Sequence, residues 1–439
     1  MSIRFLPPYF LACARVFHRR RARTPPAMRL AAVLAAGCLC SPLVLAQSEP
    51  LSLAEAVETA LAAQDPEFER FSARARALEE RAVADAQLPD PKVTAQVANV
   101  PTDSFEFDED GMTQAARLGL RQKFPAGNTL KIRGERRRAE ANAEHARRSA
   151  ALREVELATR TAWLDLAYQT RAIRIVTTSR EAIEKQVDSL LARFATGRIR
   201  AQDVLRTELE LSLLEDRLVE HRRQADVARE ALARYIGREA FRPLPESPPK
   251  FAEPQGLAAL EDRLVEHPQV RVTDARVEAA DLGIELAEQA YKPEFAIEGG
   301  YGLRTARPDL ATIGITLSLP LFTDKRQDRR RAAAVHERSA RNLDRDALLL
   351  DLKRQLEQEV ANWQRLNERL ELYRQAVGNR ARETAEASIT TYANSQTDFA
   401  ELIRAQLAEL DVELKFVELE TAAAKTWARL AWLTGNPGE

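Results

Sequence analysis

Cysteine is almost missing from this sequence of 439 residues. The three that occur, Cys13, Cys38 and Cys40, lie near the amino terminus, so the rest of the chain can form neither a disulfide nor a cysteine-ligated metal site. Aromatic residues make up only 6%. No run of about 18 uninterrupted apolar residues occurs, which excludes a transmembrane helix, although strands that cross a bilayer are shorter and escape this test.

An excess of one charge is also missing, since 65 Lys and Arg stand against 66 Asp and Glu. The first 46 residues contain seven arginines and no acid, which leaves 58 basic and 66 acidic residues in the remainder. These charges are scattered and mildly acidic in balance, unlike the basic patch of a nucleic-acid-binding protein. No nucleic-acid partner is expected.

The amino terminus has the pattern of a secretory leader. A basic region around Arg19–Arg23 precedes an apolar run at Leu30–Leu39, and a small-residue cleavage site ends at Ala46. Residues 1–46 are therefore predicted to be a signal peptide, with either Met1 or Met28 as the true start. In a minor alternative, the segment before Cys38 resembles a lipobox, which would leave Cys38 as a lipidated first residue.

The remainder is an internal duplication. A shift of 198 residues brings Phe194–Gly197 onto Tyr392–Ser395 and Gly237 onto Gly435, and a shift of 202 pairs Pro66 with Pro268. The pattern predicts two repeats, over residues 48–240 and 255–436, separated by a proline-rich linker at 241–254.

Each repeat is predicted to read helix, strand, strand, long helix, helix. Glycine and proline are absent from 135–196 and from 321–377, which predicts helices far longer than the globular mean. Returning helices are expected over 198–236 and 396–434, and a shorter helix over 67–88. Their heptad stripes are narrow and rich in alanine, typical of coiled-coil helices that pack sideways into a wall.

Four segments alternate apolar and small or polar residues with the period of a strand: about 92–100, 115–124, 294–303 and 311–319. Each is long enough to cross a bilayer at a tilt. An acidic segment, 102–111, is expected to be an exposed loop between the first two. Soluble hairpins are the alternative.

A sheet in lipid must close, because open edges leave backbone groups without partners, and four strands are too few. Three copies would supply twelve strands. The expected fold class is therefore mainly α with a membrane β-barrel: a trimeric 12-stranded β-barrel continued by an α-helical barrel.

Short phrases around the strands resemble a known family: Leu88-Pro89-Asp90-Pro91-Lys92, Asn99-Val100-Pro101, and Leu319-Pro320-Leu321-Phe322 with Arg326-Gln327. Together with the duplicated halves, they resemble the TolC family of outer-membrane efflux proteins, most closely its CzcC-type heavy-metal branch.

The resemblance implies a homotrimer in outer-membrane lipid, with its α-helical part in the periplasm. It also implies docking to a periplasmic adaptor protein and an inner-membrane RND-type pump, with heavy-metal cations as cargo. Alternatives are a drug-efflux or type I secretion duct and, with less support, a periplasmic coiled-coil adaptor or spacer without a barrel.

In this family the periplasmic tip carries the docking surface and the gate. The resemblance assigns docking to two helix turns, Thr196-Gly197-Arg198 and Asn394-Ser395-Gln396, and indicates four gate candidates: Asp203, Arg206, Glu401 and Arg404. A charged constriction formed by three copies of Glu401 facing Arg404 or Arg206 is one interpretation. In the other, Asp203 and Glu401 are acids favoured by the positive ends of their helices.

Signals of enzymatic chemistry are lacking. The five histidines are dispersed, and no metalloprotease, nucleophile-elbow or phosphate-loop motif occurs. The chain is predicted not to be an enzyme, and no catalytic, cofactor-binding or metal-binding residue is expected.

Overall fold

The computed structural model describes residues 49–63, 65–108, 111–195, 200–247, 249–305, 307–394 and 396–436. The chain divides into two units, residues 1–47 and 48–439, and only the second is described. The predicted signal peptide, with Cys38, lies outside the described residues. So do Thr196, Gly197, Arg198 and Ser395 of the two predicted docking turns.

The first half contains two helices, two strands and two long helices. Its elements are α1 (Leu53–Ala62), α2 (Pro66–Asp85), β1 (Lys92–Ala98), β2 (Gln114–Phe124), α3 (Thr129–Ala195), α4 (Ala201–Ile236) and the short 3-10 turn η1 (Gly237–Phe241).

The second half repeats this order with a broken long helix. Its elements are α5 (Leu257–Arg263), the 3-10 turn η2 (Leu264–Glu266), α6 (Pro268–Gln289), β3 (Glu294–Leu303), β4 (Leu310–Ser318), α7 (Gln327–Leu372), the π-helical turn η3 (Tyr373–Val377), α8 (Gly378–Ala393) and α9 (Phe399–Thr434).

The predicted order of elements is confirmed, with differences at several ends. Helix α3 begins at Thr129, so Gly134 lies inside the helix and does not mark its start. This glycine allows α2 to pack closely, since an added Cβ would come within 2.9 Å of the Ala82 carbonyl oxygen. Gly378 does not end the second long helix, since the chain continues through η3 into α8. The short helices α1 and α5 were not predicted.

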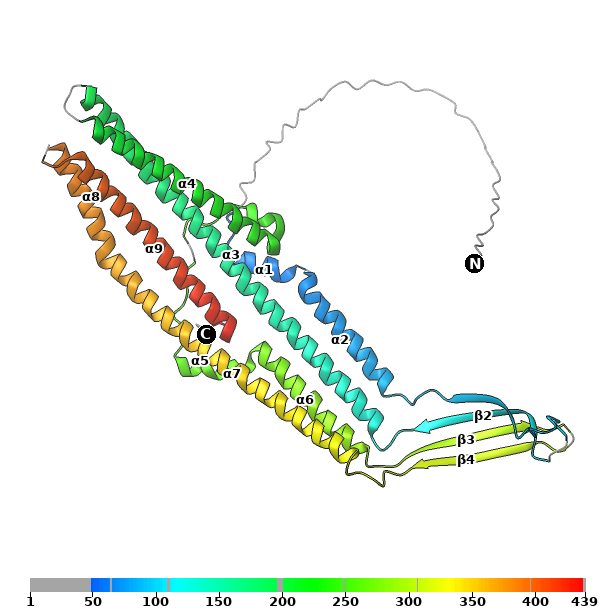
Figure 1. Ribbon diagram of the computed structural model, residues 1–439. Coiled ribbons are helices and arrows are strands. Elements are labelled where there is room, and N and C mark those ends of the chain that lie inside the picture. Colours follow the sequence, from blue (N-terminus) through cyan, green and yellow to red (C-terminus); the bar gives the residue numbers. More distant parts are fainter. Residues whose placement is uncertain are drawn as a thin grey trace, which may run out of the picture. The chain divides into compact units, whose positions relative to one another are not determined.

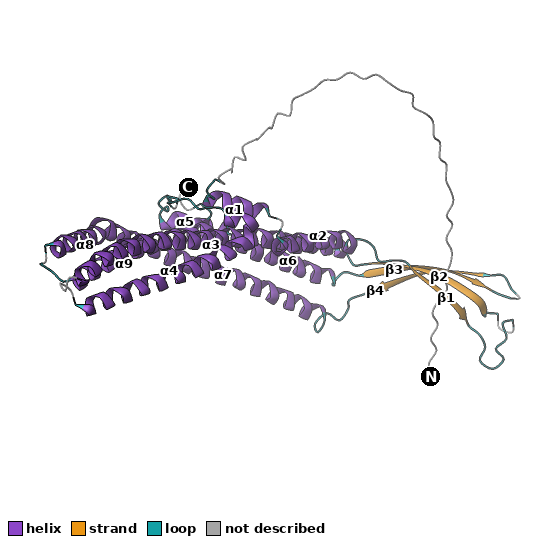
Figure 2. Cartoon of the chain, turned by 90° about the horizontal axis from the view of Figure 1, so that it is seen from above, coloured by secondary structure: helices purple, strands orange, loops and turns teal. Residues whose placement is uncertain are grey.

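The helices pack side by side. Helix α3 contacts α4 and α2 on one flank and α6 and α9 on the other, while α7 packs on α6 and α9, and α8 on α9 (Figure 1). Helix α4 therefore lies at one edge of the helical wall, and α7 with α8 at the other. Both views show the sheet beyond the ends of α2, α3, α6 and α7 (Figure 2).

The four strands form one antiparallel sheet in the order β1-β2-β3-β4. Strands β2 and β3 come from different halves and pair over nine positions, from Ala116 opposite Leu303 to Phe124 opposite Phe295. This central pairing joins the two halves, and β1 and β4 are left as the edges of the sheet.

The register places apolar side chains on one face of the sheet. Ile315 lies opposite Ile297, and Leu118 lies opposite Tyr301. Nothing in the described chain covers this face, since Ile313 is 86% and Ile315 74% exposed. Its large apolar side chains are those of Val93, Leu118, Leu120, Phe124, Phe295, Ile297, Tyr301, Leu303, Ile313, Ile315 and Leu317.

The opposite face of the sheet is polar. Arg117 pairs with Glu298 at 3.8 Å and Lys123 with Glu294 at 3.0 Å, in each case across the β2–β3 ladder. A sheet with one apolar and one charged face has the character of a boundary between lipid and water.

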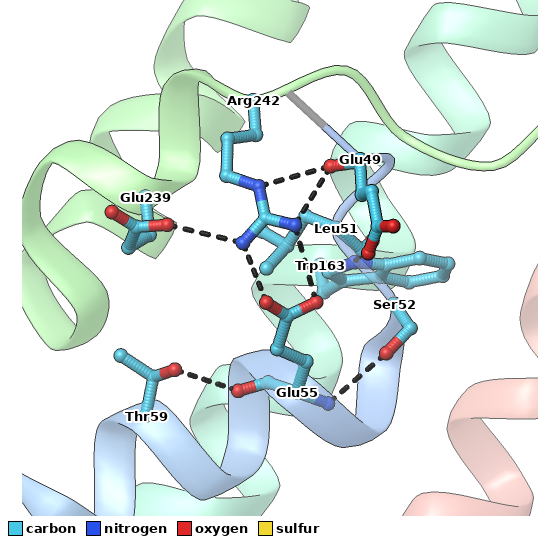
Figure 3. Close-up of polar contacts among 8 residues, drawn as sticks. All are labelled: Glu49, Leu51, Ser52, Glu55, Thr59, Trp163, Glu239 and Arg242. Atoms are coloured by element: carbon cyan, nitrogen blue, oxygen red, sulfur yellow. Dashed lines mark hydrogen bonds and ion pairs between the residues drawn. The ribbon is translucent and has the colours of Figure 1, made fainter. Parts of the chain in front are cut away.

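The segment before α1 is fixed to α3 and to the end of the first half (Figure 3). The buried Trp163 donates its indole N–H to the Leu51 carbonyl oxygen, at 3.1 Å. Arg242 donates to the Glu49 carbonyl oxygen and to the Glu55 carboxylate. These contacts, with the surrounding apolar cluster, hold α1 against the middle of α3.

Helices α2 and α6 each begin with a capping side chain followed by proline, but the two capping side chains differ in their chemistry. Asp65 precedes Pro66 and accepts a hydrogen bond from the Glu67 N–H, at 2.8 Å, while the guanidinium of Arg234 pairs with its carboxylate. His267 precedes Pro268 and accepts from the Gln269 N–H through Nδ1, at 3.3 Å, and its ring meets Trp432 edge to face. The first cap is ionic and the second aromatic.

None of the described helices combines the length and the apolar character needed to cross a bilayer.

Candidate functional site at the helix turns

Two helical hairpins end side by side, at the end of the helices far from the sheet (Figure 1). One is formed by α3 and α4, the other by α8 and α9. An apolar cluster behind their ends includes Ile183 and Val204 of the first hairpin and Phe399 and Leu402 of the second. Farther along, Arg217 of α4 pairs with Asp411 of α9 at 2.8 Å. The two ends are therefore packed against each other within one chain.

The α8–α9 turn is closed by local hydrogen bonds. The Gln396 N–H donates to the Thr391 carbonyl oxygen at 2.9 Å, and the hydroxyls of Thr391 and Thr397 are 3.2 Å apart. Across the turn the rings of Tyr392 and Phe399 meet edge to face, with centroids 5.3 Å apart. Of the predicted docking residues, Asn394 follows the end of α8 and Gln396 is hydrogen-bonded back to that helix.

Asp398 caps the first turn of α9, since its carboxylate accepts from the Glu401 N–H at 2.9 Å. The three-residue spacing between Asp398 and Glu401 is that of a capping box, so the sequence contains a signal for this cap, although the cap was not predicted. Glu401 itself forms an ion pair with Arg404 one turn later on the same helix. Two gate candidates are thus brought together, along one helix rather than across two.

Asp203 occupies the matching place in the first turn of α4. No side chain caps this helix at Arg200, and the Asp203 N–H donates to the Arg200 carbonyl oxygen at 3.1 Å. Both acids therefore lie where the positive end of a helix stabilises negative charge. This placement agrees with the interpretation that Asp203 and Glu401 are acids favoured at the starts of their helices. A role of these acids in gating stays a prediction.

A cavity of about 90 Å³ lies between the first turns of α4 and α9. Asp203 and Arg206 line it from α4, and Arg404 lines it from α9. Phe399 and Ile403 form its apolar part, while Glu401 is not part of its wall. Three of the four candidates therefore face one small space, and with Glu210 its lining carries two cationic and two anionic side chains per chain.

Among the residues that the structure describes, no group of three or more histidine, cysteine or acidic side chains is arranged to hold a metal ion.

Comparisons with known proteins bear on the fold. Residues 259–436 match the family model described as outer membrane efflux protein. No curated protein matches the chain.

Several solved structures share the fold over most of the chain. The outer membrane protein VceC from Vibrio cholerae is 18% identical, with a TM-score of 0.72 over 88% of this chain and 97% of that chain. CusC is 13% identical, with a TM-score of 0.74 over 88% and 93%. The outer membrane channel MtrE from Neisseria gonorrhoeae is 16% identical, with a TM-score of 0.70 over 88% and 89%.

The fold is thus that of outer-membrane channel proteins with a TolC-like helical tunnel. The match of residues 259–436 to the outer membrane efflux protein model agrees with the resemblance at the level of the family.

Proposed function

We propose that the chain is one subunit of an outer-membrane efflux channel that conducts its cargo passively, without enzymatic activity. The single observation that carries the proposal is the sheet, whose apolar face is uncovered while its opposite face is charged. Both faces have a suitable environment if lipid covers the apolar face and water covers the charged face. The helical part would then extend into the periplasm, as in the channels that share the fold.

A homotrimer is supported by both edges of the subunit. Strands β1 and β4 each have one side without a partner strand in the described chain. Among the helices, α4 exposes Leu205, Leu209 and Leu213 at one edge, and α7 exposes Val335, Leu343 and Leu350 at the other. An interface between unlike edges, repeated around an axis, closes a ring, and three copies would close a sheet of twelve strands.

We propose that the ends of the two hairpins dock the periplasmic adaptor of an RND-type pump, and that Asp203, Arg206, Glu401 and Arg404 control the opening there. The support is the convergence of three of these side chains on one cavity and the absence of any energy-supplying motif in the sequence. The proposed cargo is heavy-metal cations, supported by the CzcC-like phrases flanking the strands.

Two neighbouring substitutions test the membrane role. Ile313→Arg places a charge on the apolar face of β4, and Thr312→Arg places the same charge on the polar face. A charge facing lipid costs up to about 2–4 kcal/mol, so the first variant should lose most outer-membrane insertion and conductance in planar bilayers. The second should retain both. Equal insertion of the two variants would contradict the proposal.

Growth of a deletion strain on metal ions and on organic toxicants tests the cargo separately. Sensitivity to zinc, cobalt, copper or cadmium would support metal efflux. Sensitivity restricted to dyes and detergents would replace metal by organic cargo without affecting the channel role.

A further inference from the structure

The second long helix contains a local irregularity between α7 and α8. Residues Tyr373–Val377 form a π-helical turn, which places an extra residue in the turn and often marks a functional site. Gly378 follows directly, and a Cβ at this position would lie 3.0 Å from the Tyr373 carbonyl oxygen. Glycine therefore relieves crowding where the helix returns to regular geometry.

A hollow of about 350 Å³ lies beside this turn. Its walls come from three helices of the same chain: Ile175 of α3, Tyr373 and Ala381 around the turn and on α8, and Val412 and Phe416 on α9. The volume and the mainly apolar and aromatic lining are those of a small-molecule site. All of these lining residues belong to one chain, in which α9 packs against both α3 and α8.

Two carboxylates on α9, Glu409 and Glu413, lie at this wall. Burial raises the pKa of Glu409, the negative charge of Glu413 raises it further, and Glu386 adds to the effect. Arg382 opposes them, but its nearest nitrogen is 3.9 Å from the Glu409 carboxylate, beyond hydrogen-bond reach. Arg374 also lines the hollow, but its guanidinium pairs with Glu371 at 2.9 Å. The charges around Glu409 thus favour an added cation.

A metal ion does not fit these walls, because they offer mostly carbon and no group of three metal-ligating side chains among the described residues. An organic cation with an apolar body matches both parts of the wall. Its body can pack on Phe416 and Ile175, and its charge can approach the carboxylates and the face of the Tyr373 ring.

We propose that this hollow beside the π-helical turn binds an amphiphilic organic cation, with its charge at Glu409 and Glu413 and its apolar body against Phe416 and Tyr373. The ligand contacts η3, α8 and α9 together. It therefore connects the two helices of the second hairpin.

The test uses the full-length protein extracted in detergent and rhodamine 6G as the probe, with binding measured by fluorescence polarisation. Glu409→Gln with Glu413→Gln preserves side-chain size and should weaken binding at least about tenfold, since two charge-assisted contacts are lost. Ala381→Leu fills part of the hollow without changing charge and should weaken it similarly.

Glu418→Gln is the matched control, because Glu418 lies on the same helix, pairs with Lys415 and does not line the hollow. It should bind the probe like the unaltered protein. An uncharged aromatic probe, N-phenyl-1-naphthylamine, should be insensitive to the double carboxylate variant. Absence of probe binding, or equal binding by the double variant and the control, would overturn the site. Neither result would affect the channel proposal, which insertion and conductance report.

Discussion

The indole N–H of Trp163, in the middle of α3, donates to the carbonyl oxygen of Leu51, which lies just before α1. The two residues are 112 positions apart in the chain and both are fully buried. This bond fixes the start of the described chain to the long helix and satisfies two polar groups that have no access to water.

Replacement of Trp163 separates the hydrogen bond from the packing. Trp163→Phe should lower the free energy of unfolding by about 1–3 kcal/mol, because the buried Leu51 carbonyl loses its donor. Trp163→Ala should lower it by about 3–5 kcal/mol, because a large cavity is added. Denaturant unfolding of the two variants measures the difference. An unchanged free energy of unfolding for Trp163→Phe would show that the hydrogen bond contributes nothing beyond the packing of the ring.

His267 should make stability depend on pH. Burial lowers its pKa to about 4, and Arg153 contributes in the same direction. The unfolded chain binds this proton near pH 6.5, so stability is fully present above that pH and is lost as the pH falls toward 4, by about 3 kcal/mol.

His267→Asn retains a capping side chain but cannot titrate in this range. The variant should lack this part of the pH dependence when thermal unfolding is followed between pH 7 and pH 4. An unchanged pH profile would mean that other groups cause the loss.

Substitutions of Asp398 and Glu401 should affect different properties, the stability of α9 and the conductance of the channel. Asp398→Ala removes the cap of α9 and should cost about 1 kcal/mol of stability. Glu401→Ala leaves that cap in place and frees Arg404 from its ion pair. If Glu401 belongs to a gate, its loss should change single-channel conductance and cation preference in planar bilayers. If it is only a favourable acid at the helix end, current and preference stay the same.

The exposed apolar stripe on α4 should be needed for assembly. Leu209→Glu puts a charge into the proposed contact between copies and should shift the detergent-extracted protein from trimer toward monomer, as measured by light scattering. Leu209→Met keeps an apolar side chain of similar size and should remain trimeric. A trimer that tolerates Leu209→Glu would place the contact between copies elsewhere.

The sequence predicted the strands and long helices because their signals are local. Ile313 and Ile315 alternate with small or polar residues, and this pattern fixes which face of β4 is apolar. The pairing of Arg117 with Glu298 could not be predicted in the same way, because it depends on the register between strands from different halves.

At the hairpin ends, the resemblance indicated four gate candidates, and the structure shows which of them are in contact within one chain. Glu401 pairs with Arg404 on its own helix, which their three-residue spacing permits but does not require. The π-helical turn at Tyr373–Val377 was missed because none of its residues interrupts a helical pattern. Helix α1 was missed although its start has a local signal, since Ser52 caps it by accepting from the Glu55 N–H.

The unlike caps of α2 and α6 give the two halves different tolerance to acid. The Arg234 guanidinium lowers the pKa of Asp65, so that clasp survives to more acidic conditions. The imidazole of His267 gains a proton before then, next to the cation of Arg153. Mild acidification should therefore loosen the start of α6 before the start of α2, so the two halves, although they repeat one order of elements, would give way at different pH.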